Sequence, residues 1–493
     1  MSLFVRVAIT FIMTPIYLHE MGSHDYGVWE ILAAIIGYMG ILDIGIVPTV
    51  GRYIAMHHAR EDARAIRQVF STACLFMLGM GLLSAGLVLG GGYYWLQHAS
   101  DVDDSARYML LFSMLAIHLV TQFPSLATDG AFEGFQKYRL KNTLLNIKNV
   151  LIAVFVYYYI DQYDGLLVLA TVSTAGMVVK YFIGVVLLQM PRNGGLKFSL
   201  HDVSLPVFFR SLRFGGKSFI QGIASRVQVG SDRIIIGYFL GPAIVPLYSI
   251  PANLIGYIRN IGWAITDVFM PYFTSLEAKN EQHALRHVYL VASRFCVGLL
   301  LPMSIGTILV GGPFIGVWLG SEYQQDAEIV ILLLVLFTML PFLNPFSTRY
   351  LTALGKHGLL AKLSPVTALL NIILSLLLVD RFGVGGVAMG TLLPMLLLVP
   401  IVLKHTCRHL NISISHYIKE SIVPSLLPAL VLILVVGTYR YFFQLTSYPE
   451  LLLATLLGAV SYACVFFITG LHAAERSWLL ARMKVNLRDK QVF

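Results

Sequence analysis

Charged side chains inside long apolar segments are the residues of this sequence that are best placed to do chemistry. The stretch LRFGGKSFIQGIASRVQVGSDRIIIGYFLGP, residues 212–242, reads as a membrane span, yet it contains Lys217, Arg226, Asp232 and Arg233. A charge near the centre of a bilayer costs about 2.5–3.5 kcal/mol on insertion scales, so it needs a partner, water or a ligand. On an ideal helix Arg226 and Arg233 share one stripe, whereas Lys217 and Asp232 point roughly the other way.

Other predicted spans are also interrupted by charges, and basic residues outnumber acidic ones. The basic residues are Arg6, Arg52, Lys148, Lys180, Lys217, Arg226, Arg233, Arg259 and Arg294; the acidic ones are Glu30, Asp43, Asp129, Asp232 and Asp267. The spans therefore carry a surplus of about four positive charges, which requires a water-filled cavity, an anionic ligand, or both. We predict that an anion is bound by Arg226, Arg259, Lys217, Arg233, Arg6 and Arg52, because guanidinium donates two parallel hydrogen bonds and stays protonated.

Two alternatives stay open for the stripe that carries Arg226 and Arg233. Four glycines fall close to it, namely Gly215, Gly222, Gly230 and Gly237. Glycines without side chains would leave the arginines unobstructed in a cavity wall. Small residues also allow close packing of membrane helices, with Arg233 reaching the membrane surface.

Asp43 and Asp267 are the candidates for ion coupling. Asp43 is central in GYMGILDIGIVPTVGRY, where the glycines and Pro48 predict a broken or kinked helix. Its carboxylate could bind a proton or a sodium ion, or it could form a structural pair with an arginine of a neighbouring span. Asp267 lies eight residues after Arg259 in the same predicted span.

Composition and hydropathy predict an all-α polytopic membrane protein. Of the 493 residues 57% are hydrophobic and 12% are charged, and mean hydropathy is +0.75. A span needs about 20 apolar residues. On that measure we expect about fourteen transmembrane helices, near 2–19, 26–56, 66–97, 106–132, 138–160, 165–190, 208–238, 244–276, 284–318, 327–352, 358–379, 383–404, 418–439 and 449–472.

Loop charges predict the orientation, because cytoplasmic loops are enriched in lysine and arginine. Basic residues gather in alternate loops, including 57–65, 133–137, 191–207 and the tail 473–493, whereas the other loops are acidic. Both termini are therefore predicted to be cytoplasmic. The basic residues are spread over short loops, which does not suggest a nucleic-acid partner.

The sequence contains a weak internal repeat, whose clearest copies begin at Gly134 and Gly355. GFQKYRLKNTLLNIKNVL, from Gly134, is followed by DQYDGLLVLAT; GKHGLLAKLSPVTALLNIIL, from Gly355, is followed by DRFGVGGVAMGT. YLHEMGSHDYGVW similarly resembles YFLGPAIVPLYSI. We therefore expect two six-helix bundles, 1–190 and 208–406, joined by a cytoplasmic linker at 191–207. Two additional helices at 407–472 and a cytoplasmic tail at 473–493 complete this division.

These segments carry a family resemblance that extends over nearly the whole chain. PIYLHEMGSHDYGVWEILAAIIGYMGILDIGIVPTVGRYIA, at 15–55, resembles the opening of Wzx-type polysaccharide flippases. SDRIIIGYFLGPAIVPLYSI, WLGSEYQQDAEIVILLL and ALGKHGLLAKLSPVTALLNIILSLLLVDRFGVGGVAMGT are similar to the second half of that family. The family belongs to a superfamily that also contains multidrug/cation antiporters and lipid II flippases.

The resemblance implies alternating access around a central cavity. It also implies a polyprenyl-diphosphate-linked oligosaccharide as cargo, moved to the periplasmic leaflet of a bacterial cytoplasmic (inner) membrane. Membrane lipid is an expected partner, and a polysaccharide polymerase and glycosyltransferases are candidate protein partners. The family holds its cavity residues in no fixed motif, so the site residues above rest on their charge and position alone.

Two other functions stay open: a cation-coupled multidrug antiporter of the same superfamily, and a non-transport component of polysaccharide assembly, either an intramembrane enzyme or a scaffold. The net-basic interior and the two extra spans count against the antiporter. The sequence has no P-loop, no cysteine framework and no large extramembrane segment. We therefore expect a protein that is not an enzyme and has no catalytic residues, no metal site and no cofactor, with coupling to a proton or sodium gradient left open.

Overall fold

The computed structural model describes residues 2–43, 45–98, 104–211, 230–356 and 358–477, and these residues form helices and turns but no strands. The chain divides into two compact units, Met1–Pro246 (unit 1) and Leu247–Phe493 (unit 2). The sequence predicts a division at 191–207 instead. The difference arises because the helical residues 230–239 pack on the first helix of unit 1 and are therefore counted with it.

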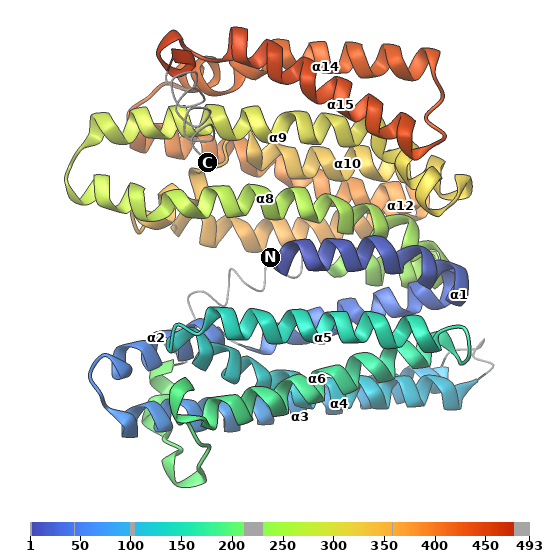
Figure 1. Cartoon of the computed structure of the whole chain (residues 1–493), viewed down its shortest axis with the longest axis vertical. Helices are drawn as coiled ribbons and strands as arrows, with labels where there is room; N and C mark the ends of the chain where they lie inside the picture. The colour runs from blue at the N-terminus through green and yellow to red at the C-terminus, as the bar shows by residue number, and fades with distance from the viewer. Residues whose placement is uncertain (1, 44, 99–103, 212–229, 357, 478–493) are drawn as a thin grey trace, which may run out of the picture. The chain divides into compact units, whose positions relative to one another are not determined.

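Unit 1 is a bundle of long helices (Figure 1). Its elements are α1 (Ser2–Met39), η1 (Gly40–Asp43), α2 (Ile46–His58), α3 (Ala63–His98), α4 (Ser105–Gly134), α5 (Tyr138–Tyr159), α6 (Gly165–Gln189), η2 (Pro191–Asn193), η3 (Leu200–Asp202), helical residues 205–211 and 230–239, and η4 (Pro242–Ile244). Helices α3, α4 and α6 run side by side (Figure 1). Their buried faces form one apolar core around Met77, Leu119 and Phe123.

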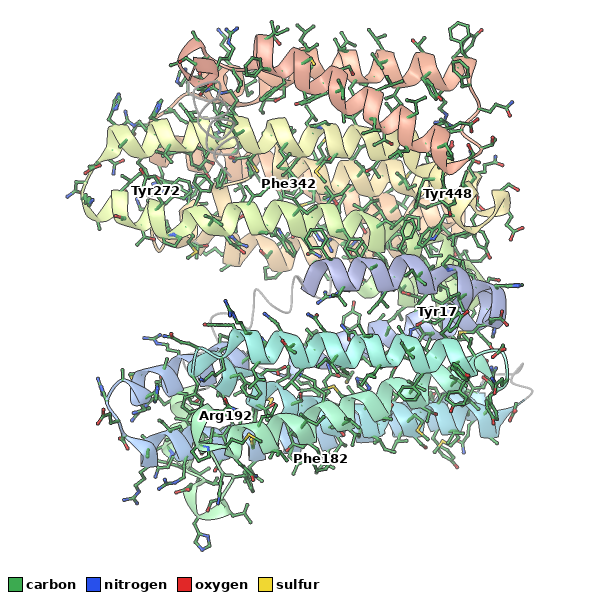
Figure 2. All side chains as sticks on the ribbon, viewed as in Figure 1. Tyr17, Phe182, Arg192, Tyr272, Phe342 and Tyr448 are labelled. Carbon is green, nitrogen blue, oxygen red and sulfur yellow. The ribbon has the colours of Figure 1, made fainter. Side chains whose placement is uncertain are left out.

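Unit 2 contains a second bundle, on one side of which α14 and α15 lie against α9 (Figure 1). Its elements are α8 (Val245–Ala278), α9 (Gln282–Leu319), η5 (Ser321–Tyr323), α10 (Gln324–Phe342), α11 (Ser347–Ala353), α12 (Gly358–Leu410), α13 (Ile414–Tyr417), the π-helical turn η6 (Ile418–Ile422), α14 (Val423–Phe442), α15 (Tyr448–Val465) and the π-helical turn η7 (Phe466–Gly470). Phe342 lies in the core of this unit (Figure 2), where a Cβ on Gly262 would approach its ring to 2.3 Å.

The helices have the length and the surface of membrane spans. In the described part of the chain, nine helices are long and apolar enough to cross a membrane. Two of them each contain two expected spans, because α1 turns at Gly22 (φ 72°) and α12 turns at Gly383 (φ 55°). Large apolar side chains face outward, as Phe182 on α6 does (61% exposed; Figure 2). Such a surface is stable in lipid, so the protein is a multi-pass membrane protein.

The internal repeat is visible in the backbone turns. Residues with a left-handed backbone recur in pairs with one constant spacing along the chain: Gly22 and Gly241, Glu61 and Asn280, Gln136 and Gly355. Asp164, the N-cap of α6, stands at this same spacing before the turn at Gly383. Because a turn fixes where one helix ends and the next begins, the constant spacing indicates that the two halves repeat one order of helices.

The predicted break near Asp43 is confirmed. Helix α1 ends at Met39, η1 follows, and α2 begins after Gly45, whose φ of 71° only glycine adopts readily. Glycine also allows α2 and α4 to cross closely, since a Cβ on Gly130 would lie 2.9 Å from the Val47 carbonyl oxygen. The first half of the chain thus has a close crossing of α2 and α4 directly after the helix break.

Candidate functional site

A buried charged pair joins two membrane helices of unit 1. Lys180 Nζ on α6 donates to Asp129 Oδ2 on α4 over 2.8 Å and to Ser125 Oγ over 3.0 Å. The side chains of Lys180 and Asp129 are 7% and 14% exposed. The negative charge of Asp129 is therefore already neutralised by one lysine of its own unit.

A second lysine lies beside this pair without a carboxylate of its own. Lys148 on α5 interacts electrostatically with Lys180, Asp129 and Arg6, and it is half-buried. Among the described residues no carboxylate forms an ion pair with Lys148. Its side chain reaches towards α6, where a Cβ on Gly176 would lie 3.5 Å from Lys148 Cγ.

Four helices therefore place three cations and one anion within electrostatic reach of one another: Arg6 on α1, Asp129 on α4, Lys148 on α5 and Lys180 on α6. We call these four residues the unit 1 charge cluster. Of these, only Arg6 is in the site predicted from sequence. The residue types were visible in the sequence, but their proximity across helices was not.

Arg233, on the predicted stripe within residues 212–242, lies in an ion pair. Its Nη1 is 3.0 Å from Glu30 Oε2 on α1, and Glu30 Oε1 accepts a hydrogen bond from the Tyr26 hydroxyl at 3.1 Å. The Arg233 and Glu30 side chains are 18% and 8% exposed. An anion that binds Arg233 would have to compete with this carboxylate.

The two described glycines of that stripe serve close packing. A Cβ on Gly230 would lie 3.0 Å from the Tyr38 ring, and one on Gly237 would lie 2.4 Å from Ile31, both on α1. Of the two alternatives for the stripe, these positions favour helix packing. Gly215, Gly222, Lys217 and Arg226 lie outside the described residues.

Arg259 differs from Arg233, because among the described residues no carboxylate pairs with it. Its guanidinium lies 5.3 Å from the ring centroid of Trp263, one turn further along α8. Such a cation–π contact contributes about 0.5–1 kcal/mol at exposed sites. Within the described part of the structure its buried Nε has no hydrogen-bond partner, so this arginine retains donor capacity for a ligand.

The remaining predicted residues are Arg6, Arg52, Asp43 and Asp267. Arg6 and Arg52 are exposed, on α1 and α2. Asp43 ends η1, and its side chain lies outside the described residues. The Asp267 side chain is 57% exposed and forms an ion pair with Arg349 on α11.

Arg294, the ninth basic residue of the predicted spans, is engaged by the end of the chain. It is 2% exposed, and its guanidinium contacts His472 Nε2 at 2.7 Å, Glu475, and Glu420 Oε2 at 3.7 Å. These contacts tie α9 to η6, the turn before α14, and to the segment after η7. Arg294 is therefore a structural cation of unit 2.

Unit 2 also contains a large apolar pocket of about 1010 Å³. Side chains of α8, α9, α14 and α15 line it, among them Ile255, Leu299, Leu432, Leu452 and Tyr448, which is the first residue of α15 and is labelled in Figure 2. None of the described residues that line it is charged. Its chemistry suits a hydrocarbon chain.

The chemistry that these sites offer is ionic binding. In the described part of the chain no group of three or more histidine, cysteine, aspartate or glutamate side chains could hold a metal ion. The unit 1 charge cluster and Arg259 offer ammonium and guanidinium donors to an anion within membrane helices.

Comparison with known protein families gives two matches. Residues 21–328 match the model of a family described as polysaccharide biosynthesis protein, and residues 248–457 match that of the lipid II flippase MurJ. A putative O-antigen transporter of Shigella flexneri is 26% identical over 75% of this chain and 87% of its own length. A probable low-salt glycan biosynthesis flippase of Haloferax volcanii is 26% identical over 36% of this chain and 37% of its own.

Solved structures share the fold. The inward closed conformation of the lipid II flippase MurJ superposes with a TM-score of 0.74 at 14% identity, covering 94% of this chain and 96% of that one. An inward-facing multidrug resistance transporter of the MATE family gives 0.66 at 14% identity, covering 83% and 98%. The expected all-α architecture of this superfamily is thereby confirmed.

Proposed function

Because the chain belongs to the polysaccharide biosynthesis protein family, we propose that it is a flippase for polyprenyl-diphosphate-linked oligosaccharide. It moves this cargo from the cytoplasmic to the periplasmic leaflet by alternating access, for surface polysaccharide assembly. The Shigella relative, named as a putative O-antigen transporter, supports this choice of cargo.

The observation that carries the proposal is the unbalanced positive charge inside the membrane helices. Lys148 lies near a lysine–aspartate pair that is already neutral, and Arg259 has no carboxylate among the described residues. A diphosphate carries about two negative charges and many acceptor oxygens, and it would stabilise such cations when they leave water.

The apolar pocket of unit 2 supports a lipid-linked rather than a free oligosaccharide. It offers a volume of about 1010 Å³ at helices α14 and α15, and the described residues of its lining are uncharged. A polyprenyl chain is pure hydrocarbon and gains about 0.8 kcal/mol for each methylene removed from water, although much less when it comes from lipid.

Several features of this function are expected from its class. The protein acts without chemical conversion of the cargo, and it resides in a bacterial cytoplasmic membrane with both termini in the cytoplasm. Transport is driven by a proton or sodium gradient, with Asp43 as the first candidate for coupling. Asp267 is the weaker candidate, because Arg349 already neutralises it.

The proposal is tested by a leaflet-specific assay in a strain that lacks this gene. Labelled polyprenyl-diphosphate oligosaccharide is supplied to inverted vesicles, and its arrival in the opposite leaflet is followed with and without the protein. We expect transfer only with the protein. Transfer that does not depend on the protein, together with protein-dependent export of cationic drugs, would instead establish the antiporter function.

A further inference from the structure

A pocket of about 590 Å³ lies at the end of unit 1 where α4 turns into α5 and where α6 ends. Its rim carries Lys137, Arg139 and Arg192. Leu140 and Leu187 form its apolar part. Arg192 is seen in Figure 2 at one end of the unit 1 helices, with Tyr17 towards the other end.

The backbone around this pocket is held in place. Gln136 adopts a left-handed conformation with φ 59°, and the Lys137 N–H donates to the Phe132 carbonyl at 2.7 Å. On the opposite wall the Asn193 side chain is 7% exposed and donates to the Leu187 carbonyl at 3.0 Å. The cations on the rim are therefore presented by fixed turns.

The two walls also pack directly on one another. Gly194 has a φ of 123°, and a Cβ there would lie 2.6 Å from the Phe135 ring. Only glycine fits such a contact, so the turn after α6 is pressed onto the α4–α5 turn. This contact keeps Arg192 next to Lys137 and Arg139 across the pocket.

The positive charge of this pocket is not matched by its own lining. No aspartate or glutamate is among the described residues that line it. The carboxylate nearest in sequence, Glu133, is engaged with Lys141 at 2.5 Å. Three basic side chains thus face one small volume beside apolar side chains.

We propose that this pocket binds the phosphate headgroup of an anionic lipid of the cytoplasmic leaflet, that is, a headgroup with net negative charge. Basic pockets at the cytoplasmic ends of membrane helices suit anionic headgroups, because phosphate meets the cations while the hydrocarbon stays in the membrane. Leu140, Leu187 and the half-exposed Tyr138 supply the apolar side of such a site. The placement of this end in the cytoplasm rests on the proposed function and its topology.

Two lipids carry the required phosphate chemistry, the polyprenyl-diphosphate cargo and an anionic phospholipid. Native mass spectrometry of the full-length protein distinguishes them, with short-chain polyprenyl diphosphate, phosphatidylglycerol and zwitterionic phosphatidylcholine as the added lipids. The pocket variant carries Lys137→Gln, Arg139→Gln and Arg192→Gln. Its control carries Arg60→Gln, Arg64→Gln and Lys197→Gln, which remove the same charge from the basic loops but not from this pocket.

We expect the pocket variant to bind at least one of the two anionic lipids, polyprenyl diphosphate or phosphatidylglycerol, about tenfold more weakly than the control variant does. A loss confined to polyprenyl diphosphate identifies the pocket as a docking site for cargo. An equal loss for phosphatidylglycerol identifies a resident phospholipid, and the site then stands even if the leaflet assay shows no cargo transfer. Equal binding by the two variants overturns the proposal.

A second measurement decides the matter if the pocket variant does not fold. A benzophenone amino acid replaces Tyr138, which is 54% exposed at the pocket. We expect the benzophenone to cross-link the anionic phosphate lipid, and we expect inorganic pyrophosphate to compete with this cross-linking. Cross-linking of phosphatidylcholine to the same extent overturns the proposal.

Discussion

Lys180 Nζ lies 2.8 Å from Asp129 Oδ2, and this pair occurs within the membrane helices α6 and α4. A buried pair contributes little net stability, but removal of one partner leaves a charge in an apolar surrounding. Lys148 lies in the same unit 1 charge cluster, but among the described residues no carboxylate forms an ion pair with it. Its replacement would therefore leave no described carboxylate without an ion-pair partner. The two lysines therefore provide a matched comparison between a structural cation and a binding cation.

Lys180→Met should destabilise the protein by about 3 kcal/mol, the lower end of the range for breaking a buried pair, because this one is slightly exposed. Lys148→Met should leave the melting temperature in detergent unchanged and should lower transport per folded molecule about tenfold. The double variant Lys180→Met with Asp129→Asn should recover the melting temperature. A stable Lys180→Met protein would contradict the structural role of this pair.

At the end of unit 1 where α4 and α6 begin, Arg107 links Asp25 and Asp164. Asp164 also caps α6, because its carboxylate accepts a hydrogen bond from the Leu167 N–H at 3.0 Å. Burial acts to raise the pKa of Asp164, but the hydrogen bonds from Arg107 and from the backbone outweigh burial, so the pKa lies below its ordinary value of 3.8. The stabilisation is therefore complete above that value and is lost as the pH falls through the lowered pKa.

Asp164→Asn keeps the helix cap but removes the charge. We expect it to be less stable than the wild type by about 1 kcal/mol at neutral pH, as an exposed ion pair contributes. The difference in melting temperature should begin to shrink below about pH 4, where the carboxyl of the unfolded chain becomes protonated, and it should disappear once the pH is below the lowered pKa of the folded protein. A difference that does not change with pH would mean that the charge of Asp164 contributes nothing.

The predicted orientation is tested by cysteine labelling of intact cells. In a variant without native cysteines, Lys197→Cys should resist an impermeant maleimide, whereas Glu322→Cys should react, because the basic loops are expected to be cytoplasmic. Both positions are exposed, so access to the thiol does not limit the reaction. Permeabilised cells provide the control, in which both should react. Labelling of Lys197→Cys from outside would show that the predicted orientation is wrong.

Much of the helix order could be predicted from sequence, because it depends on local properties. Apolar length gives the spans, and glycines mark turns such as Gly22, Gly45 and Gly383. The internal repeat is detectable in the residue types, and the paired backbone turns at Gly22 and Gly241 follow the same repeat. The spans and turns are each read within one short window of the chain, and the repeat is found by comparing two such windows.

Charge pairing across helices could not be predicted in the same way. Lys180 and Asp129 are 51 residues apart, and Arg233 meets Glu30 from a helix far away in the sequence. Helical periodicity shows which residues share a face, but it does not show what that face packs against. The sequence therefore gives no reason to separate Arg233 from Arg259, whereas among the described residues the structure provides only Arg233 with a carboxylate.

The strongest test of the anion site is Arg259, which lies 5.3 Å from the ring centroid of Trp263. Since the described structure pairs it with no carboxylate, Arg259→Ala should strand no acid and should leave the melting temperature unchanged. A charge-assisted contact contributes about 1.5–3 kcal/mol, so transport per folded molecule should fall about ten- to a hundredfold. Arg259→Lys should restore part of this loss, because it keeps the charge without the paired donors of guanidinium. Arg440→Ala is the matched control, because Arg440 forms an exposed pair with Glu328 at 2.8 Å and should transport normally. Normal transport by a well-folded Arg259→Ala protein would exclude this arginine from the cargo site.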